Sequence, residues 1–101
     1  MTTRAWVLAA VAATGLGSMA VTAAQTPPAP KVVTADKIGE TLYVLKGGGG
    51  NTALFLTAKG AVLVDTKNPG WGQPLLDAVK AITSLPVTMV INTHAHYDHT
   101  N

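Results

Sequence analysis

The residues best suited to chemistry lie together near the end of the sequence. All three histidines of the chain fall within six positions, and Asp98 stands immediately before the last of them. Imidazole nitrogens and carboxylate oxygens are donors that Zn²⁺ and similar ions accept in proteins. In an extended segment, residues two apart point the same way, so His94 and His96 can reach one metal ion. Asp98 and His99 then turn toward a neighbouring point, and the segment predicts a metal-binding site.

A second interpretation of this segment is a solvated histidine-rich loop that takes up metal ions without specificity. The surroundings favour a built site, because the segment directly follows an apolar strand expected over residues 87–91. Proteins of the α/β class place their sites at such strand ends. Without a metal, the clustered imidazoles would also repel each other as they became protonated.

The residues upstream predict a small unit of mixed strands and helix. Apolar runs separated by turn residues are typical of strands. The expected strands are a weak one over residues 32–38, and others over 42–45, 52–56, 61–64 and 87–91. The run over 61–64 is apolar at every position, which favours burial on both faces. The strand over 87–91 is expected to be buried as well.

One helix is expected between the last two strands. It should begin near Gln73, with Pro74 at its first position, where a missing N–H costs nothing, and it should end at Leu85 and Pro86. Its apolar residues recur at helical spacing; they are Leu75, Leu76, Val79 and Ile82. A helix that covers a sheet, with polar groups gathered at the strand ends, suits an α/β sandwich.

The first 24 residues form a region of their own. A basic start at Arg4 is followed by an uncharged run over residues 5–21 and by small residues at 22–24. This order predicts a secretory signal peptide over residues 1–24, and therefore a periplasmic or secreted protein without stable membrane association after cleavage. An uncleaved anchor is the alternative, since the run is nearly long enough to span a bilayer. Residues 25–31 are Pro-rich and predict an extended spacer.

Charge and cysteine content exclude several classes of function. After the predicted leader, six lysines stand against five Asp or Glu residues, and no Lys/Arg cluster is present. A nucleic-acid partner is therefore not expected, and a small-molecule substrate is. The sequence has no cysteine, so it offers neither a disulfide nor a thiolate ligand for a metal.

The pattern His94-x-His96-x-Asp98-His99 resembles the signature of the metallo-β-lactamase superfamily. The resemblance extends back to about Lys37 and includes the apolar strand that ends in Asp65, the Gly-Trp-Gly loop, the helix and the last strand. It implies an α/β fold in which residues 32–101 form the first, N-terminal half of an αββα metallo-β-lactamase-type sandwich. The second half is then expected downstream.

The resemblance also implies roles for the residues of the site. His94 and His96 would bind the first of two Zn²⁺ ions, and Asp98 and His99 the second. Asp65 would lie beneath the metals and hold the ligand loop, with an ordinary cap at the strand end as the alternative. A third histidine for the first metal, a bridging aspartate and a last histidine for the second are expected downstream of Asn101.

The activity that the resemblance implies is hydrolysis at a binuclear zinc site. Hydroxide would attack the carbonyl of an amide, ester, thioester or lactone, with Asp98 both binding metal and orienting the water. The histidine at position 99 places the resemblance nearer to the third β-lactamase subclass, lactonases and glyoxalase-II-like thioesterases. Thr100 and Asn101 stand where relatives often carry glycine, which leaves the subfamily open. The alternatives are an iron-dependent oxidoreductase on the same fold and a non-catalytic periplasmic metal-binding fragment.

Two further features precede the helix. The four glycines at 47–50 lack the Gly-Lys-Ser/Thr that would follow in a phosphate-binding loop, and they predict a flexible connection between strands. The alternative, taken from the resemblance, is a short flap over substrate. Trp71 is predicted to be a packing anchor rather than a contact to ligand.

Overall fold

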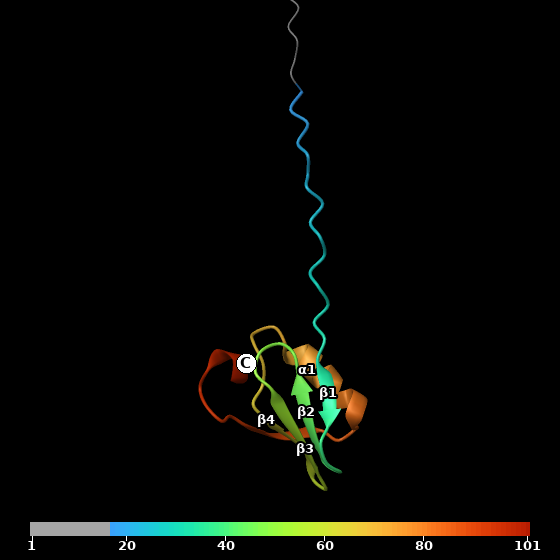
Figure 1. Ribbon diagram of the computed structural model, residues 1–101, viewed down its shortest axis with the longest axis vertical. Coiled ribbons are helices and arrows are strands. Elements are labelled where there is room, and N and C mark those ends of the chain that lie inside the picture. The colour runs from blue at the N-terminus through green and yellow to red at the C-terminus, as the bar shows by residue number, and fades with distance from the viewer. Residues whose placement is uncertain (1–16) are drawn as a thin grey trace, which may run out of the picture.

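The computed structural model describes residues 17–101. Most of the predicted leader, residues 1–16, lies outside the described residues. Residues 17–33 contain no helix or strand; they run toward the folded body as an extended segment (Figure 1), which meets it at Lys31 and Val33. In the described part of the chain, no helix combines the length and apolar character needed to cross a membrane.

Within residues 17–101, five strands form one mixed sheet in the order β1-β2-β3-β4-β5. Neighbouring strands are antiparallel up to β4, whereas β4 and β5 are parallel. The elements are β1 (Thr34–Lys37), β2 (Leu42–Lys46), β3 (Thr52–Thr57), β4 (Gly60–Val64), α1 (Gly72–Ile82), β5 (Val87–Ile91) and the 3₁₀ turn η1 (Tyr97–His99). The chain has the α/β fold expected, and the β4-α1-β5 crossover places the carboxyl ends of β4 and β5 at one edge.

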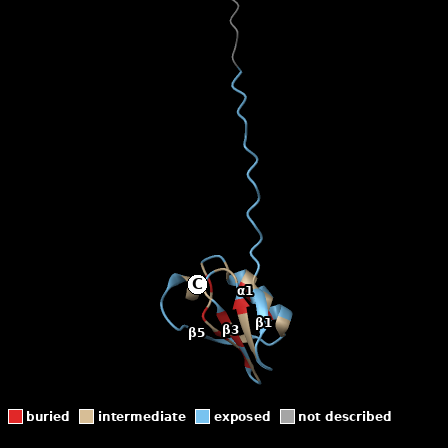
Figure 2. Cartoon of the chain, in the orientation of Figure 1, coloured by how far each residue is buried: buried red, intermediate tan, exposed pale blue. Residues whose placement is uncertain are grey.

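The core lies between α1 and one face of the sheet. Alternate residues of β3 and β4 point to this face, as the two-residue period of a strand requires. Leu54 and Leu63 face each other across the two strands and are almost fully buried. Leu75 and Val79, one helical turn apart on α1, cover them and are each 2% exposed. Figure 2 shows the buried positions concentrated in the central strands.

The helix differs from expectation at both ends. It begins at Gly72, so Pro74 is its third residue and not its first. Proline is tolerated there because the N–H groups of the first helical turn have no partner within the helix. The helix ends at Ile82, before Leu85 and Pro86, and the N–H of Thr83 bonds to the carbonyl of Val79.

The predicted burial of the last two strands was wrong. In β4, Ala61 and Leu63 are buried, whereas Val62 and Val64 are only half-buried. In β5, Met89, Val90 and Ile91 remain about half exposed, at 55%, 49% and 46%. The physical reason is that β5 lies at the edge of the sheet, and nothing in residues 17–101 packs over the face opposite α1.

Candidate metal centre

Asp65 anchors the site directly after β4. Its N–H donates to the carbonyl of Ile91 at 2.7 Å, which continues the pairing of β4 with β5. Its backbone has a φ of 64°, and among the described residues it is the only non-glycine residue with a positive φ. Aspartate tolerates this left-handed conformation better than most side chains do. The buried carboxylate is directed at the segment that follows β5, the ligand loop of residues 93–99.

The Asp65 carboxylate binds both ends of the ligand loop. Its Oδ1 accepts from the N–H of Thr93 at 2.7 Å. Its Oδ2 accepts from the Thr93 hydroxyl at 2.7 Å and pairs with Nδ1 of His99 at 2.9 Å. A single side chain directly after β4 thus determines where the loop leaves β5 and where its last histidine lies.

These hydrogen bonds assign the tautomers of two histidines. An ionised carboxylate can only accept hydrogen bonds, so His99 must donate from Nδ1–H. The Thr93 hydroxyl likewise donates its one proton to Asp65. The Thr93 oxygen can then only accept from Nδ1–H of His94, which lies 2.8 Å away. In the neutral imidazoles this arrangement leaves the lone pair on Nε2 of both rings, and a neutral ring with a free nitrogen is the form in which histidine binds a metal.

Hydrogen bonding also holds Asp65 in its ionised form. The Thr93 N–H lowers the pKa of the carboxyl group from 3.8 to about 2, with smaller contributions from the Thr93 hydroxyl and His99, against the opposing effect of burial. Asp65 therefore remains an acceptor at every pH at which the histidines can bind metal.

The predicted ligands gather within a short distance of one another. The ring centroid of His94 lies 4.7 Å from that of His96 and 4.3 Å from that of His99. Asp98 Oδ2 lies 3.6 Å from Nε2 of His99. The structure thus brings His94 beside both other imidazoles and places Asp98 next to His99, the two residues expected to share a metal ion.

Geometry alone also groups Asp65 with His94 and His99, because one donor atom from each lies within 4.8 Å of the others. Asp65 is nevertheless the weakest candidate ligand of the three. Its oxygens already accept three hydrogen bonds, and a metal ion would have to displace donors that orient its own histidines. This arrangement favours Asp65 as a support of the loop, which remains a prediction.

The glycine loop (residues 47–50) forms a wall of the site that the sequence did not reveal. The sequence predicted a flexible connection here, and the structure shows that the loop is packed against its neighbours. The Gly50 N–H donates to the carbonyl of Asp98 at 3.2 Å. A Cβ added at Gly50 would overlap the His99 imidazole, and one at Gly49 would lie 2.9 Å from the Asp98 carbonyl oxygen. At Gly48 it would overlap the Trp71 ring, so Trp71 packs on the loop as predicted.

Lys67 is a second feature that the sequence did not reveal. Its side chain is fully buried, although it lies only two residues beyond Asp65. Its ammonium donates to the carbonyls of Leu45 at 2.8 Å and Gly50 at 2.6 Å. Burial lowers the pKa of this group from its usual 10.5. A lysine in a segment between elements is normally solvated. The burial of Lys67 can be recognised only from the contacts that the fold gives it.

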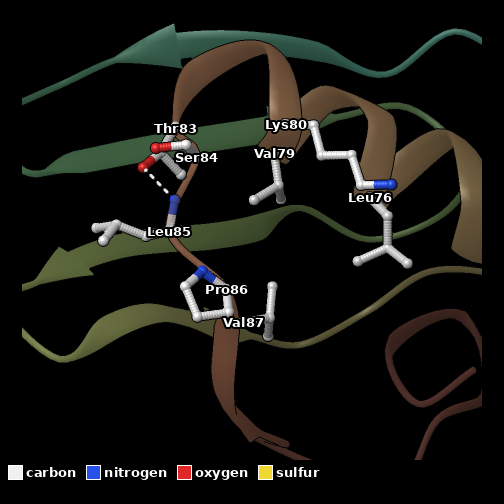
Figure 3. Close-up of a pocket in the computed structure, with 8 residues that line it drawn as sticks. All are labelled: Leu76, Val79, Lys80, Thr83, Ser84, Leu85, Pro86 and Val87. Carbon is white, nitrogen blue, oxygen red and sulfur yellow. Dashed lines mark hydrogen bonds between the residues drawn. The ribbon is translucent and has the colours of Figure 1, made fainter.

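A pocket of about 290 Å³, drawn in Figure 3, has none of the candidate metal ligands in its lining. Its walls come from the end of α1 and the start of β5, and include Val79, Leu85 and Val87. The ligand loop follows the opposite end of β5, so this pocket is not part of the candidate metal centre. Its lining is mostly apolar and holds no carboxylate or imidazole.

Replacement of Asp65 by asparagine is expected to weaken metal binding in the complete protein by roughly 10- to 100-fold, as losses of a ligand's hydrogen-bond partner do. Asparagine can still accept from the Thr93 N–H, but an NH₂ group in place of Oδ2 can accept neither from His99 nor from the Thr93 hydroxyl. Competition titration with a chromophoric chelator would measure the change. Wild-type affinity in the variant would show that Asp65 only caps its strand.

The pKa of Asp65 also predicts how stability depends on pH. The folded value, about 2, lies below the ordinary value of 3.8, so the ionised group stabilises the fold above pH 3.8. This contribution is lost as the pH falls toward 2. The metal-free protein should therefore lose stability to urea over this window, and Asp65→Asn should lose less. Parallel losses in the two proteins would show that Asp65 is not responsible.

The sequence was compared with protein families and with curated proteins. A family model described as the metallo-beta-lactamase superfamily matches residues 45–101. Over 54 residues, which are 52% of this chain, the sequence is 43% identical to metallo-beta-lactamase domain-containing protein 1 of Rattus norvegicus and covers 22% of it. It is 41% identical to the Mus musculus protein of that name over 52% of this chain and 21% of the relative. The Homo sapiens protein is 43% identical over the same share of this chain and 20% of its own length. The chain thus spans about a fifth of the length of these relatives.

Proposed function

The chain belongs to the metallo-β-lactamase superfamily, and from this premise we propose that the complete protein is a metal-dependent hydrolase with a binuclear zinc site. The observation that supports it most is the hydrogen-bond network of Asp65, Thr93 and the two histidines. That network leaves Nε2 of His94 and His99 free to bind a metal. A loop whose imidazoles are oriented in advance suits metal binding better than a solvated histidine tract does.

The donor set suits two neighbouring ions. His94 and His96 would hold the first, and Asp98 and His99 the second, with further ligands supplied from outside these residues. Two imidazoles, or an imidazole and a carboxylate, are ligand pairs that Zn²⁺ accepts readily. Iron accepts the same atoms, so the choice of zinc rests on the family.

In the proposed reaction, water adds across a carbonyl–heteroatom bond of an amide, ester, thioester or lactone. Bound metal ions would lower the pKa of a water molecule to about 7 and polarise the carbonyl. Asp98 would orient the attacking water through its carboxylate and accept its proton. It would then pass that proton to the departing nitrogen, oxygen or sulfur, while the acyl carbon keeps the hydroxyl group. Asp65 holds His99 in place during this cycle.

The test is to purify the complete protein, measure its bound metals, and assay a chromogenic β-lactam, a thioester and a lactone. We expect about two zinc ions per chain, turnover of at least one substrate, and loss of that turnover in His96→Ala. Hydrolysis that survives both chelation and His96→Ala would refute the proposal. Bound iron with oxygen consumption would favour the oxidoreductase, and stoichiometric zinc without turnover would favour a metal-binding role.

We also propose that the protein is exported to the periplasm or secreted, which rests on the order of residues in the predicted leader. Cleavage after Ala23 or Ala24 should leave a mature chain that begins at residue 24 or 25. Intact-mass measurement of the exported protein would show the loss. Full-length protein that keeps Met1 and remains in the membrane fraction would instead show that residues 1–24 serve as an anchor.

A further inference from the structure

The ligand loop lies between two backbone segments that are far apart in the sequence. On one side, residues 65–67 bond to its end: the N–H of Thr66 donates to the carbonyl of His99 at 2.9 Å, and Lys67 and Asn101 bond to each other through both backbone groups. On the other side, the glycine loop approaches. Gly50 donates its N–H to the carbonyl of Asp98, and its Cα lies directly against the His99 ring.

Lys67 connects these two segments. Its main chain belongs to the first, and its ammonium reaches the second, where it donates to the carbonyl of Gly50 at 2.6 Å. The same ammonium donates to the carbonyl of Leu45 at 2.8 Å, at the end of the strand that leads into the glycine loop. In effect, one side chain fixes the loop at both of its ends.

The glycine loop depends on such contacts, among them the Asn68 N–H that donates to the Gly48 carbonyl at 2.8 Å, because its own backbone is unusually free. Gly47, Gly48 and Gly49 all have positive φ values, and glycine loses more conformational freedom on folding than any other residue. Without the ammonium, the Gly50 carbonyl would lose its short hydrogen bond, and the loop could move away from His99. The His99 imidazole, which Gly50 contacts, would then be held less firmly.

The chemistry of Lys67 also favours a specific role. Within residues 17–101 no carboxylate lies within ion-pair distance of the ammonium, so two carbonyls stabilise a fully buried charge. Burial of a cation without a counter-ion is costly. A methionine of similar length would fill the same space without that cost, and it would leave the two carbonyls without their donor.

We propose that Lys67 is a positioning residue for the metal centre, which holds the glycine loop against His99 and so fixes the geometry of the second metal position. This inference rests on the proposed function, because it needs a metal at Asp98 and His99. It is specific in its consequence: loss of Lys67 should disturb the second position, while the first position, at His94 and His96, changes little.

The experiment uses the complete protein with Lys67→Met, titrated with Co²⁺ and Zn²⁺ and followed by the cobalt ligand-field spectrum. We expect the affinity of the weaker of two sites to fall roughly 10- to 100-fold, with altered cobalt bands. Hydrogen exchange of the metal-free protein should be faster at the Gly50 and His99 amides. Lys59→Met, in an exposed turn, controls for loss of a lysine. Val79→Ala lowers stability in the core, far from the loop, and should leave the spectrum unchanged.

The outcomes separate the two proposals. If the wild-type protein binds two cobalt ions and Lys67→Met gives the same affinities and bands, Lys67 has no positioning role and the proposed function stands. If Val79→Ala shifts the spectrum as much as Lys67→Met at equal loss of thermal stability, the effect is one of general stability and the inference is overturned. If wild-type protein binds no metal, the proposed function fails and this inference fails with it.

Discussion

Replacement of Gly50 by alanine is expected to lower the affinity of the complete protein for the second of the two proposed metal ions by about 100-fold. The added methyl group would overlap the imidazole of His99. The ring cannot move aside freely, because its Nδ1 is held by Asp65 at 2.9 Å. Either that hydrogen bond breaks or the loop is displaced, and a misplacement of about 1 Å in a catalytic constellation can cost about 100-fold in rate.

A matched control for this variant exists in the same chain. Gly72, the first residue of α1, has no atom within 4 Å of the place where a Cβ would be added. Neither Gly72 nor Gly50 has a positive φ, so backbone strain does not separate them. Gly72→Ala should leave zinc and cobalt titrations unchanged. Equal titration curves for wild type and Gly50→Ala would mean that the close approach of the glycine loop to His99 has no consequence for the site.

The candidate metal ligands could be picked out from the sequence because their signal is local. His94, His96 and Asp98 lie within five positions of one another, so donor type and spacing were visible without a fold. Asp65 was singled out by the resemblance to the family, since its place at the end of an apolar strand would by itself also suit an ordinary cap. The α/β class followed from the two periodicities of the strands and the helix, and the structure confirms it.

Lys67 and the glycine loop could not be predicted because their roles come from tertiary contacts. A lysine three residues beyond a strand is normally exposed, and the burial of Lys67 depends on two carbonyls from residues 17 and 22 positions away. Four glycines in a row indicate conformational freedom. Whether a loop of this kind is open or packed depends on what approaches it, here Trp71 and His99.

The burial of β5 shows a different limit of sequence patterns. An apolar run indicates that a strand can be buried on both faces, but it does not say which residues cover it. In residues 17–101, α1 covers one face of the sheet, and the other face leaves Phe55, Met89 and Ile91 between 44% and 55% exposed. A contiguous apolar surface of this kind is typical of an interface with another layer of structure.

Residues 25–101 alone are therefore expected to show no hydrolytic turnover. A hydrolytic zinc ion needs about three protein ligands and a water. This segment offers two for the first metal, from His94 and His96, and two for the second, from Asp98 and His99. Its 77 residues contain no cysteine and are close to the size at which one core barely sustains itself. The uncovered face of its sheet should also promote aggregation.

The measurement compares residues 25–101 with the complete protein, in zinc titration, thermal unfolding and assays with a β-lactam, a thioester and a lactone. The short polypeptide should bind zinc weakly, unfold without a sharp transition and turn over none of the substrates. Turnover by the short polypeptide that disappears in His96→Ala would show that four ligands on one loop suffice, and the ligand-count argument would be wrong.

The weak zinc binding expected of the short polypeptide should itself depend on the network of Asp65, Thr93 and His99. The short polypeptide contains all three residues, so its imidazoles are already oriented for a metal ion. Asp65→Asn should remove that residual affinity even where no activity exists to be lost.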